Sequence, residues 1–175
     1  MTVATLRPNA AGDLLGLSQY PASGANWDKV AEAVEDSGAT YVWTDQSVAW
    51  QRDLYNLPSL PSGILFIAYI KVIFWAERLS GTSGSGRTIV KTGGTEYDGG
   101  QNNLTTAWAE YSTIHTTNPQ TGVAWTVAEV NALQVGVRLK GDGTSGQSAC
   151  TQIYVEVVPS HESSHHQLGA YKRQP

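Results

Sequence analysis

The sequence predicts an all-β domain, built as a two-sheet antiparallel sandwich with jelly-roll connectivity. Three observations support this prediction: a long apolar stretch with strand periodicity, many short alternating segments between turn residues, and 18 glycines in 175 residues. Short alternating segments at regular spacing, with Gly, Pro, Asn and Asp between them, are typical of such sandwiches. We expect a single domain over residues 1–158 and a polar C-terminal tail or arm over 159–175.

The long apolar stretch, expected to be the central strand, covers residues 63–80 and reads GILFIAYIKVIFWAERLS. Its first half is apolar at every position, which is typical of a strand buried on both faces. From Lys71 onward the stretch alternates, and Tyr69 and Trp75 fall on its outward side. Its β-branched and aromatic residues favour a strand over a helix. Its length and its charges do not suit a bilayer span.

Alternation and turn residues predict the remaining strands. They are expected at 2–7 (an edge strand), 14–20, 40–44, 50–57, 87–91, 95–97, 108–116, 133–140 and 149–158, with a turn at 9–13. Residues 25–34 fit either a helix or a strand, and both alternatives stay open. In the last strand, alternation places Thr151, Ile153, Val155 and Val157 inward and Cys150, Gln152, Tyr154 and Glu156 outward.

One short helix is expected near residues 127–132. Thr126-Val127-Ala128-Glu129 has the spacing of a capping box, in which a Thr N-cap and a Glu three residues later each bond the other's backbone. Trp125 and Val130 stand at the two positions of a hydrophobic staple. This connection is therefore predicted to be helical.

Composition and charge exclude several classes of partner and compartment. The net charge of -4 disfavours nucleic acid and anionic membranes, because both bind basic patches. Cys150 is the single cysteine, so no intrachain disulfide forms. The N-terminal residues lack the basic and apolar regions of a secretory signal, so we expect synthesis and folding in a cytoplasm. Charged residues make up only 15%, which fits a surface partly covered by neighbouring subunits.

The sequence contains no recognisable catalytic or metal-binding motif, and we expect a protein that is not an enzyme, with no catalytic residue, metal or cofactor. His115 has no nucleophile or carboxylate that the sequence places beside it. The tail residues His161, Glu162, His165 and His166 match no structural zinc spacing. Turn aspartates at 13, 36, 98 and 142 could hold a structural calcium ion, but hydrogen bonding within the turns explains them equally well.

The choice of aromatic residues is skewed, with six Trp and eight Tyr against two Phe. Trp and Tyr combine a large apolar area with a polar tip, which suits sugar platforms and subunit interfaces. Core aromatics that reach a hydrogen-bond partner at the rim of a sheet are the alternative explanation. Candidate interface or glycan contacts are Tyr69, Trp75, Tyr154, Trp27, Trp43, Trp50, Trp108, His161 and Tyr171.

Several stretches carry a resemblance to known proteins: TLRPNAAGD, DLYNLPSLPSG, KTGGTEYDGG, TTNPQTGVAWTVAEVNALQVGVRL and CTQIYVEV. With these the chain resembles uncharacterised β-sandwich proteins of tailed phages and prophages, over nearly all of residues 2–158. The most specific part is 118–137. The order of the strands is more loosely similar to that of carbohydrate-binding sandwich modules. The resemblance implies a structural protein of the virion and carries no active site.

Two functional hypotheses follow. The first is a virion structural protein, a capsid decoration or auxiliary protein or a tail- or fibre-associated one, which acts through contacts between subunits. Its partners would be further copies of itself, as a homo-oligomer, and other virion proteins, reached by arms at 1–7 and 161–175 or by β-augmentation. The second is a carbohydrate-binding module that uses exposed Trp and Tyr, for example on a host surface glycan. Neither nucleic acid nor membrane is an expected partner.

Overall fold

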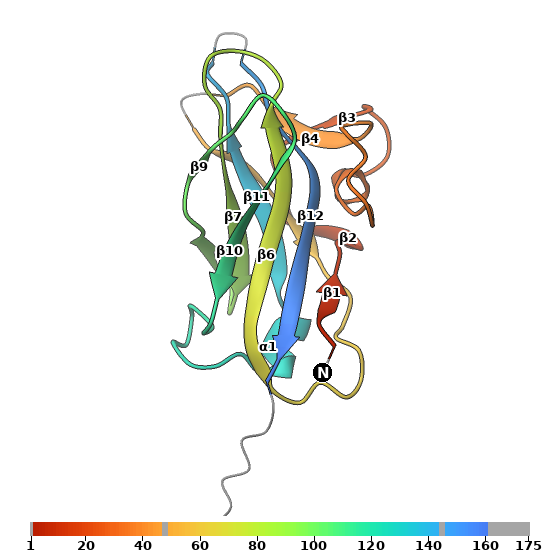
Figure 1. Cartoon of the computed structure of the whole chain (residues 1–175), viewed down its shortest axis with the longest axis vertical. Coiled ribbons are helices and arrows are strands. Elements are labelled where there is room, and N and C mark those ends of the chain that lie inside the picture. Colours follow the sequence, from red (N-terminus) through yellow and green to blue (C-terminus); the bar gives the residue numbers. More distant parts are fainter. Residues whose placement is uncertain (1, 47–48, 144–145, 161–175) are drawn as a thin grey trace, which may run out of the picture.

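The computed structural model describes residues 2–46, 49–143 and 146–160, which form two antiparallel sheets packed face to face (Figure 1). Sheet A contains β1 (Ala4–Leu6), β3 (Ser18–Tyr20), β4 (Tyr41–Thr44), β6 (Ile67–Arg78), β10 (Ala109–His115) and β12 (Ser148–Pro159). Sheet B contains β2 (Ala10–Leu15), β5 (Gln51–Asn56), β7 (Ser85–Thr92), β8 (Thr95–Asp98), β9 (Asn102–Asn103) and β11 (Gln134–Lys140). The predicted all-β sandwich is confirmed.

The strand order is that of a jelly roll. In sheet A, β4, β12, β6 and β10 are neighbours in that order, and in sheet B, β5, β11, β7 and β8 are. The chain therefore alternates between the sheets in two interlocking Greek keys, as the predicted connectivity requires. β3 extends sheet A beyond β4, β2 extends sheet B beyond β5, and β1 and β9 pair with β12 and β7.

β6 is the central strand of sheet A, paired with β10 on one side and β12 on the other. Phe74 and its inward neighbours lie in the core, and Tyr69 and Trp75 are half-buried on the opposite face, as predicted. The strand is shorter than expected, because it begins at Ile67. Residues 64–66 lie outside it, and the side chain of Leu65 is 73% exposed. β12 ends at Pro159 opposite Ile67, and within the described residues the only backbone hydrogen bond beyond that pair is from the Ser160 amide to the Phe66 carbonyl at 3.0 Å.

The N-terminal segments differ most from the prediction. Instead of a turn at 9–13 and one strand at 14–20, the chain forms β2 and β3, which belong to different sheets. A register shift between Ala11 and Leu15 lets β2 run past Gly12. There, a Cβ atom would lie 2.6 Å from the backbone of Leu54, so only glycine fits. Residues 25–34 contain only the 3-10 helix η1 (Asn26–Lys29), and neither open alternative describes the whole segment.

The prediction of which β12 residues face the core was wrong at the beginning of the strand. Ile153, Val155 and Val157 face the core as predicted, but Cys150, predicted outward, lies in the core as well. A register shift between Cys150 and Gln152 reverses the alternation at that point. The buried Thr151 then hydrogen-bonds to residues outside the sheet, with its hydroxyl 2.7 Å from Asp36.

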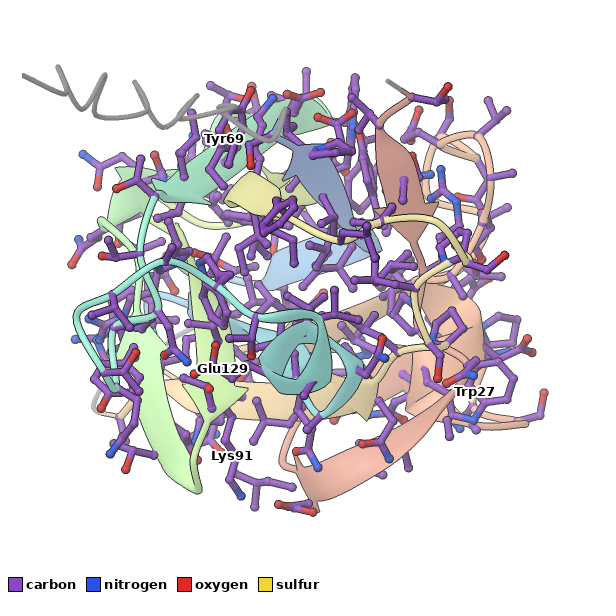
Figure 2. The ribbon with its side chains drawn as sticks, turned by 90° about the horizontal axis from the view of Figure 1, so that it is seen from below. Trp27, Tyr69, Lys91 and Glu129 are labelled. Carbon is purple, nitrogen blue, oxygen red and sulfur yellow. The ribbon has the colours of Figure 1, made fainter. Side chains whose placement is uncertain are left out.

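The predicted helix is α1 (Val127–Asn131), and its capping box is present. The Thr126 hydroxyl accepts from the Glu129 amide at 3.2 Å, and the Glu129 carboxylate accepts from the Thr126 amide at 2.8 Å. Trp125 and Val130, the staple residues, are both in the core. Figure 2 shows α1 between the two layers at one end of the sandwich, with Tyr69 and Lys91 toward opposite outer sides. None of the helices in the described ranges is long and apolar enough to cross a membrane.

Candidate functional site

Aromatic side chains gather on the outer face of sheet A, the face turned away from sheet B. Val42 of β4 is in the core, so alternation turns Tyr41 and Trp43 outward. Tyr20 of β3 pairs directly with Tyr41, and Trp108 immediately precedes β10. We call Tyr20, Tyr41, Trp43 and Trp108 the aromatic face.

Three of these rings form a row across the sheet. The Tyr20 and Tyr41 rings stack with centroids 5.0 Å apart and planes 19° apart. The Tyr41 and Trp108 centroids are 6.2 Å apart with planes at 46°. β10 and β4 lie on opposite sides of β6 and β12, so the Trp108 contact spans two strands. In Figure 1 the segment between β9 and β10 crosses in front of the upper part of β6, toward β4.

Gly38 supports Trp108 from the side. Its φ is +80°, and a Cβ there would lie 2.7 Å from Cζ2 of Trp108, so both its backbone and its contact require glycine. Asp36 holds this turn, because its carboxylate accepts from the amides of Gly38 at 3.0 Å and Thr40 at 2.9 Å. With the Thr151 hydroxyl as a further donor, the turn is fixed to β12.

A polar hollow of about 330 Å³ adjoins the aromatic face at Trp43. Its lining residues are Gly16, Ser18, Trp43, Thr44, Asp45, Gln46 and Gln51. Trp43 stands between Ser18 of β3 and Ala149 of β12 in the strand register. Ala149 is fully buried although it lies outside the core between the sheets. The hollow thus combines one indole ring with hydroxyl, amide and carboxylate groups.

Asp53 fixes the chain that leads into this site. It is fully buried, and its carboxylate accepts from the amides of Gly16 at 2.7 Å and Leu17 at 2.8 Å. It also accepts from Nδ2 of Asn26 at 2.6 Å and the hydroxyl of Tyr55 at 3.0 Å. Burial raises the pKa of Asp53, and these four hydrogen bonds oppose that effect. The start of β3, which carries Ser18 and Tyr20, is therefore anchored to β5.

Carboxylates border the aromatic face. Glu77 of β6 pairs with Ala149, which in turn pairs with Trp43. Burial and the charge of Glu35 raise the pKa of Glu77. Burial, then Tyr20, then Glu77 raise the pKa of Tyr41. Glu77 and Glu35 therefore place negative charge beside the row of rings.

The other predicted candidates are distributed over the molecule. Trp75 and Tyr154 are on the outer face of sheet A with Tyr69, and the Arg7 guanidinium lies 4.7 Å from the Tyr154 ring centroid. The guanidinium carbon of Arg87, on sheet B, lies 4.1 Å from the centroid of the Trp50 ring. Trp27 is in η1 and packs on the core. Two further candidates, His161 and Tyr171, lie outside the described residues.

Sequence reasoning singled out Trp43 and Trp108 but missed Tyr20, Tyr41 and Asp53. Tyr41 and Trp43 alternate within one short strand, which is a local signal that they share a face. Asp53 and Tyr55 are two residues apart in one strand, so they point to the same side of the sheet. This spacing was the one local indication that the Asp53 carboxylate is buried. Tyr20 could not be placed, because nothing local indicates that β3 pairs with β4.

The outer side of sheet B is of a different kind. The Glu96 carboxylate lies 2.8 Å from the guanidinium of Arg52 and 2.6 Å from that of Arg138. The Asp98 carboxylate lies 2.6 Å from the guanidinium of Arg138 and 3.1 Å from that of Arg87. These charges are paired with each other, as is typical of a stabilising surface network.

Metal-binding side chains do not converge in the part of the chain that the structure describes. There, no group of three or more His, Cys, Asp or Glu side chains is placed to hold a metal ion. The turn aspartates bond to protein groups instead: Asp13 to Lys91, Asp36 to its own turn, Asp98 to arginines and Asp142 to backbone amides. Burial lowers the pKa of His115, whose backbone carbonyl accepts from the Trp125 indole at 3.0 Å.

No family model and no curated protein sequence matches the chain. Among solved structures, the chain is similar to the CBM22-1 xylan-binding domain of a Paenibacillus barcinonensis protein, with 9% identity over 91% of this chain and 97% of that one and a TM-score of 0.47. A carbohydrate-binding module of a Cellvibrio mixtus lichenase, in complex with cellotriose, shows 14% identity over 92% and 100%, with a TM-score of 0.42. A tailspike protein domain of bacteriophage CBA120 shows 11% identity over 87% and 19%, with a TM-score of 0.42. At these identities and scores, the likenesses carry no argument about this chain.

Proposed function

We propose that the chain is a non-catalytic carbohydrate-binding module and that the aromatic face of sheet A holds the glycan. The observation that carries the proposal is the row of Tyr20, Tyr41 and Trp108 beside a polar hollow that contains Trp43. A sugar ring presents C–H groups on its faces and hydroxyl groups around its rim. Aromatic rings next to hydroxyl, amide and carboxylate groups match both parts.

The geometry indicates how a glycan would lie. The hollow, at about 330 Å³, is near the lower end of small-molecule sites, so it would take a short stretch of sugar over Trp43. Ser18, Gln46 and Gln51 would supply hydrogen bonds at its rim. Because the Tyr20 and Tyr41 rings face each other, the ligand would contact the free side of Tyr20, which is 50% exposed.

Native-gel affinity electrophoresis tests the proposal. The full chain is run through gels that contain soluble neutral polysaccharides of different backbones: β-glucans, xylans, mannans and galactans. We expect at least one of them to retard the chain relative to an inert protein of similar charge and mass. Unchanged mobility with every polymer in the panel would contradict the proposal.

A second candidate function, a structural subunit of a virion, is favoured by the apolar end of the sandwich where α1 lies. A groove of about 510 Å³ there is lined by Leu65, Phe66, Ile67, Ala124, Trp125, Thr126, Val127, Ala128 and Ser160. A neighbouring groove of about 340 Å³ is lined by Thr2, Val3, Ala4, Pro61, Ser62, Gly63, Ile64 and Pro159. Neither lining contains a charged side chain, and the cores of subunit interfaces are depleted of charge. Residues 64–66 contribute to both grooves, Ile64 to the second and Leu65 and Phe66 to the first, and we call this shared segment the ridge. A second copy of the chain could cover the ridge by two-fold symmetry.

Light scattering behind a sizing column tests this second candidate. If a second copy covers the ridge, the full chain has the mass of a dimer, and Leu65→Asp has that of a monomer, because a charge would be buried in the interface. Ile114→Asp is the matched control, since Ile114 is also exposed, at 55%, but lies on β10. A monomeric wild type over the whole concentration range would contradict the two-fold contact on which this candidate rests. Truncation after Ser160 separates the effect of residues 161–175 from that of the ridge.

A further inference from the structure

We infer that the aromatic face selects glycans without acidic groups and discriminates against uronate-bearing and sulfated ones. This inference rests on the proposed function and adds the chemical class of the ligand. It follows from the charges that surround the rings.

Glu77 supplies the first of these charges. It lies on the outer face of sheet A, in the same cross-strand row as Trp43. Only the small side chain of Ala149, on the strand between them, separates the two residues. Glu35 supplies the second charge, because its carboxylate accepts from the amide of Ser37, next to Gly38, whose Cβ position lies 2.7 Å from the Trp108 ring. An anionic group on a bound sugar would therefore meet two carboxylates beside the row.

Asp45 supplies the charge in the hollow. It is the sole ionisable residue among the seven that line the hollow, and the others are glycine, hydroxyl, amide and indole residues. Its carboxylate accepts a hydrogen bond from Nε2 of Gln46 at 3.0 Å. A sugar carboxylate or sulfate here would therefore find a like charge and no lysine or arginine to pair with.

The basic side chains of the described residues lie elsewhere. Arg52, Arg87 and Arg138 are on sheet B, where they pair with Glu96 and Asp98. On the outer face of sheet A, Lys71 pairs with Glu110, and Arg7 lies over Tyr154. Arg78 follows Glu77 on β6, so alternation turns it to the opposite face, where its guanidinium donates to the Gly81 carbonyl. On sheet B, Lys91 pairs with Asp13, and Lys140 alternates with the core residue Leu139, so it points to the outer side of that sheet.

Lys29 belongs to η1, which follows β3 along the chain and contacts it, and it faces away from the rings. It is buried in η1, with its Nζ 3.6 Å from the Cβ position of Gly24. The Gly24 carbonyl accepts a hydrogen bond from the side chain of Gln19. Gln19 stands between Ser18 and Tyr20, so its side chain points to the face of β3 opposite the Tyr20 ring, and Lys29 lies on that opposite side. Within residues 2–46, 49–143 and 146–160, no base is therefore placed to offset Glu77 and Asp45. Like charges brought together at a binding site reject the wrong ligand.

Titration calorimetry with paired polymers tests the inference. Each pair shares one backbone, for example hydroxyethyl cellulose with carboxymethyl cellulose, or a neutral xylan with a glucuronate-substituted one. We expect the wild type to bind the neutral member at least about tenfold more tightly at low salt, with a smaller ratio at high salt, because screening weakens the repulsion. In the Glu77→Gln, Asp45→Asn double variant the ratio is expected to fall several-fold.

Glu77→Gln is also measured alone, and its control is Glu156→Gln, which makes the same change of one charge on the same face of sheet A. Glu156 pairs with Lys71, six residues along β6 from Glu77. The control is expected to keep the wild-type ratio, so an equal fall in the control would show an effect of net charge alone and overturn the inference. Equal or tighter binding of the acidic polymer by the wild type also overturns it. Binding to neither member of any pair would instead overturn the proposed function.

Discussion

Replacing Asp53 with alanine is expected to lower the free energy of unfolding by about 3–5 kcal/mol, because it leaves several buried donors without a partner. The donors that lose an acceptor are the amide of Leu17, one N–H of Asn26 and the hydroxyl of Tyr55. The Gly16 amide keeps a second acceptor, the Arg52 carbonyl at 2.9 Å. Chemical denaturation in urea measures the loss. Asp28→Ala, at an exposed position, is the control and is expected to change stability by less than about 0.5 kcal/mol. A loss of similar size in both variants would contradict this role for Asp53.

Asp53→Asn separates hydrogen bonding from charge. It keeps one acceptor oxygen, so its loss of stability is expected to be smaller than that of Asp53→Ala. Burial raises the pKa of Asp53 in the folded state, so between its unfolded and folded pKa values the folded protein binds more protons than the unfolded one. Stability from this group is therefore present below the unfolded pKa and declines as pH rises through the folded pKa. As the pH rises through the folded pKa of Asp53, the difference in free energy of unfolding between wild type and Asp53→Asn should become smaller. A larger difference at higher pH would contradict a raised pKa for Asp53.

Replacing Trp43 with alanine is expected to weaken binding of the glycan by about 30-fold, equivalent to about 2 kcal/mol. Trp43 is the one aromatic ring in the lining of the hollow, so its loss removes the stacking surface there and leaves the polar groups alone. Tyr20→Ala is expected to weaken binding as well, and less strongly, because Tyr41 remains beside it. Titration calorimetry with the polysaccharide found by electrophoresis measures both effects.

Tyr97→Ala is the matched control for these aromatic variants. Tyr97 belongs to β8 of sheet B, and its hydroxyl donates to Gln120 at 2.6 Å, away from the aromatic face. The control is expected to bind as the wild type does, and circular dichroism checks that every variant is folded. Wild-type affinity in Trp43→Ala, or an equal loss in Tyr97→Ala, would exclude the hollow as the site.

Local patterns were enough to predict much of the fold. Alternation identified β11, whose Val135, Val137 and Leu139 all face the core. The spacing of Thr126 and Glu129 predicted α1 with its cap, because a capping box depends on four consecutive residues alone. Regular spacing of strands and turns predicted the sandwich as a whole.

Features that depend on pairing between distant segments could not be predicted in this way. The bulge that turns Cys150 into the core follows from how β12 is shared between β4 and β6. The row of Tyr20, Tyr41 and Trp108 comes from three segments that only the strand order brings together. Sequence alternation also extended the central strand over residues 64–66, which lie before the last paired position of β6, Ile67 opposite Pro159.

Nitrogen-edited NMR of the tryptophan indoles, during titration with a neutral oligosaccharide cut from the retarding polymer, locates the ligand within one molecule. Trp43 and Trp108 belong to the aromatic face, whereas Trp50 lies against Arg87 of sheet B and Trp125 is buried beside α1. Binding at the aromatic face predicts saturable shifts of the Trp43 and Trp108 indole signals, with those of Trp50 and Trp125 unchanged. Shifts led by Trp50, or no shift of any indole at saturating oligosaccharide, would contradict a glycan site on sheet A.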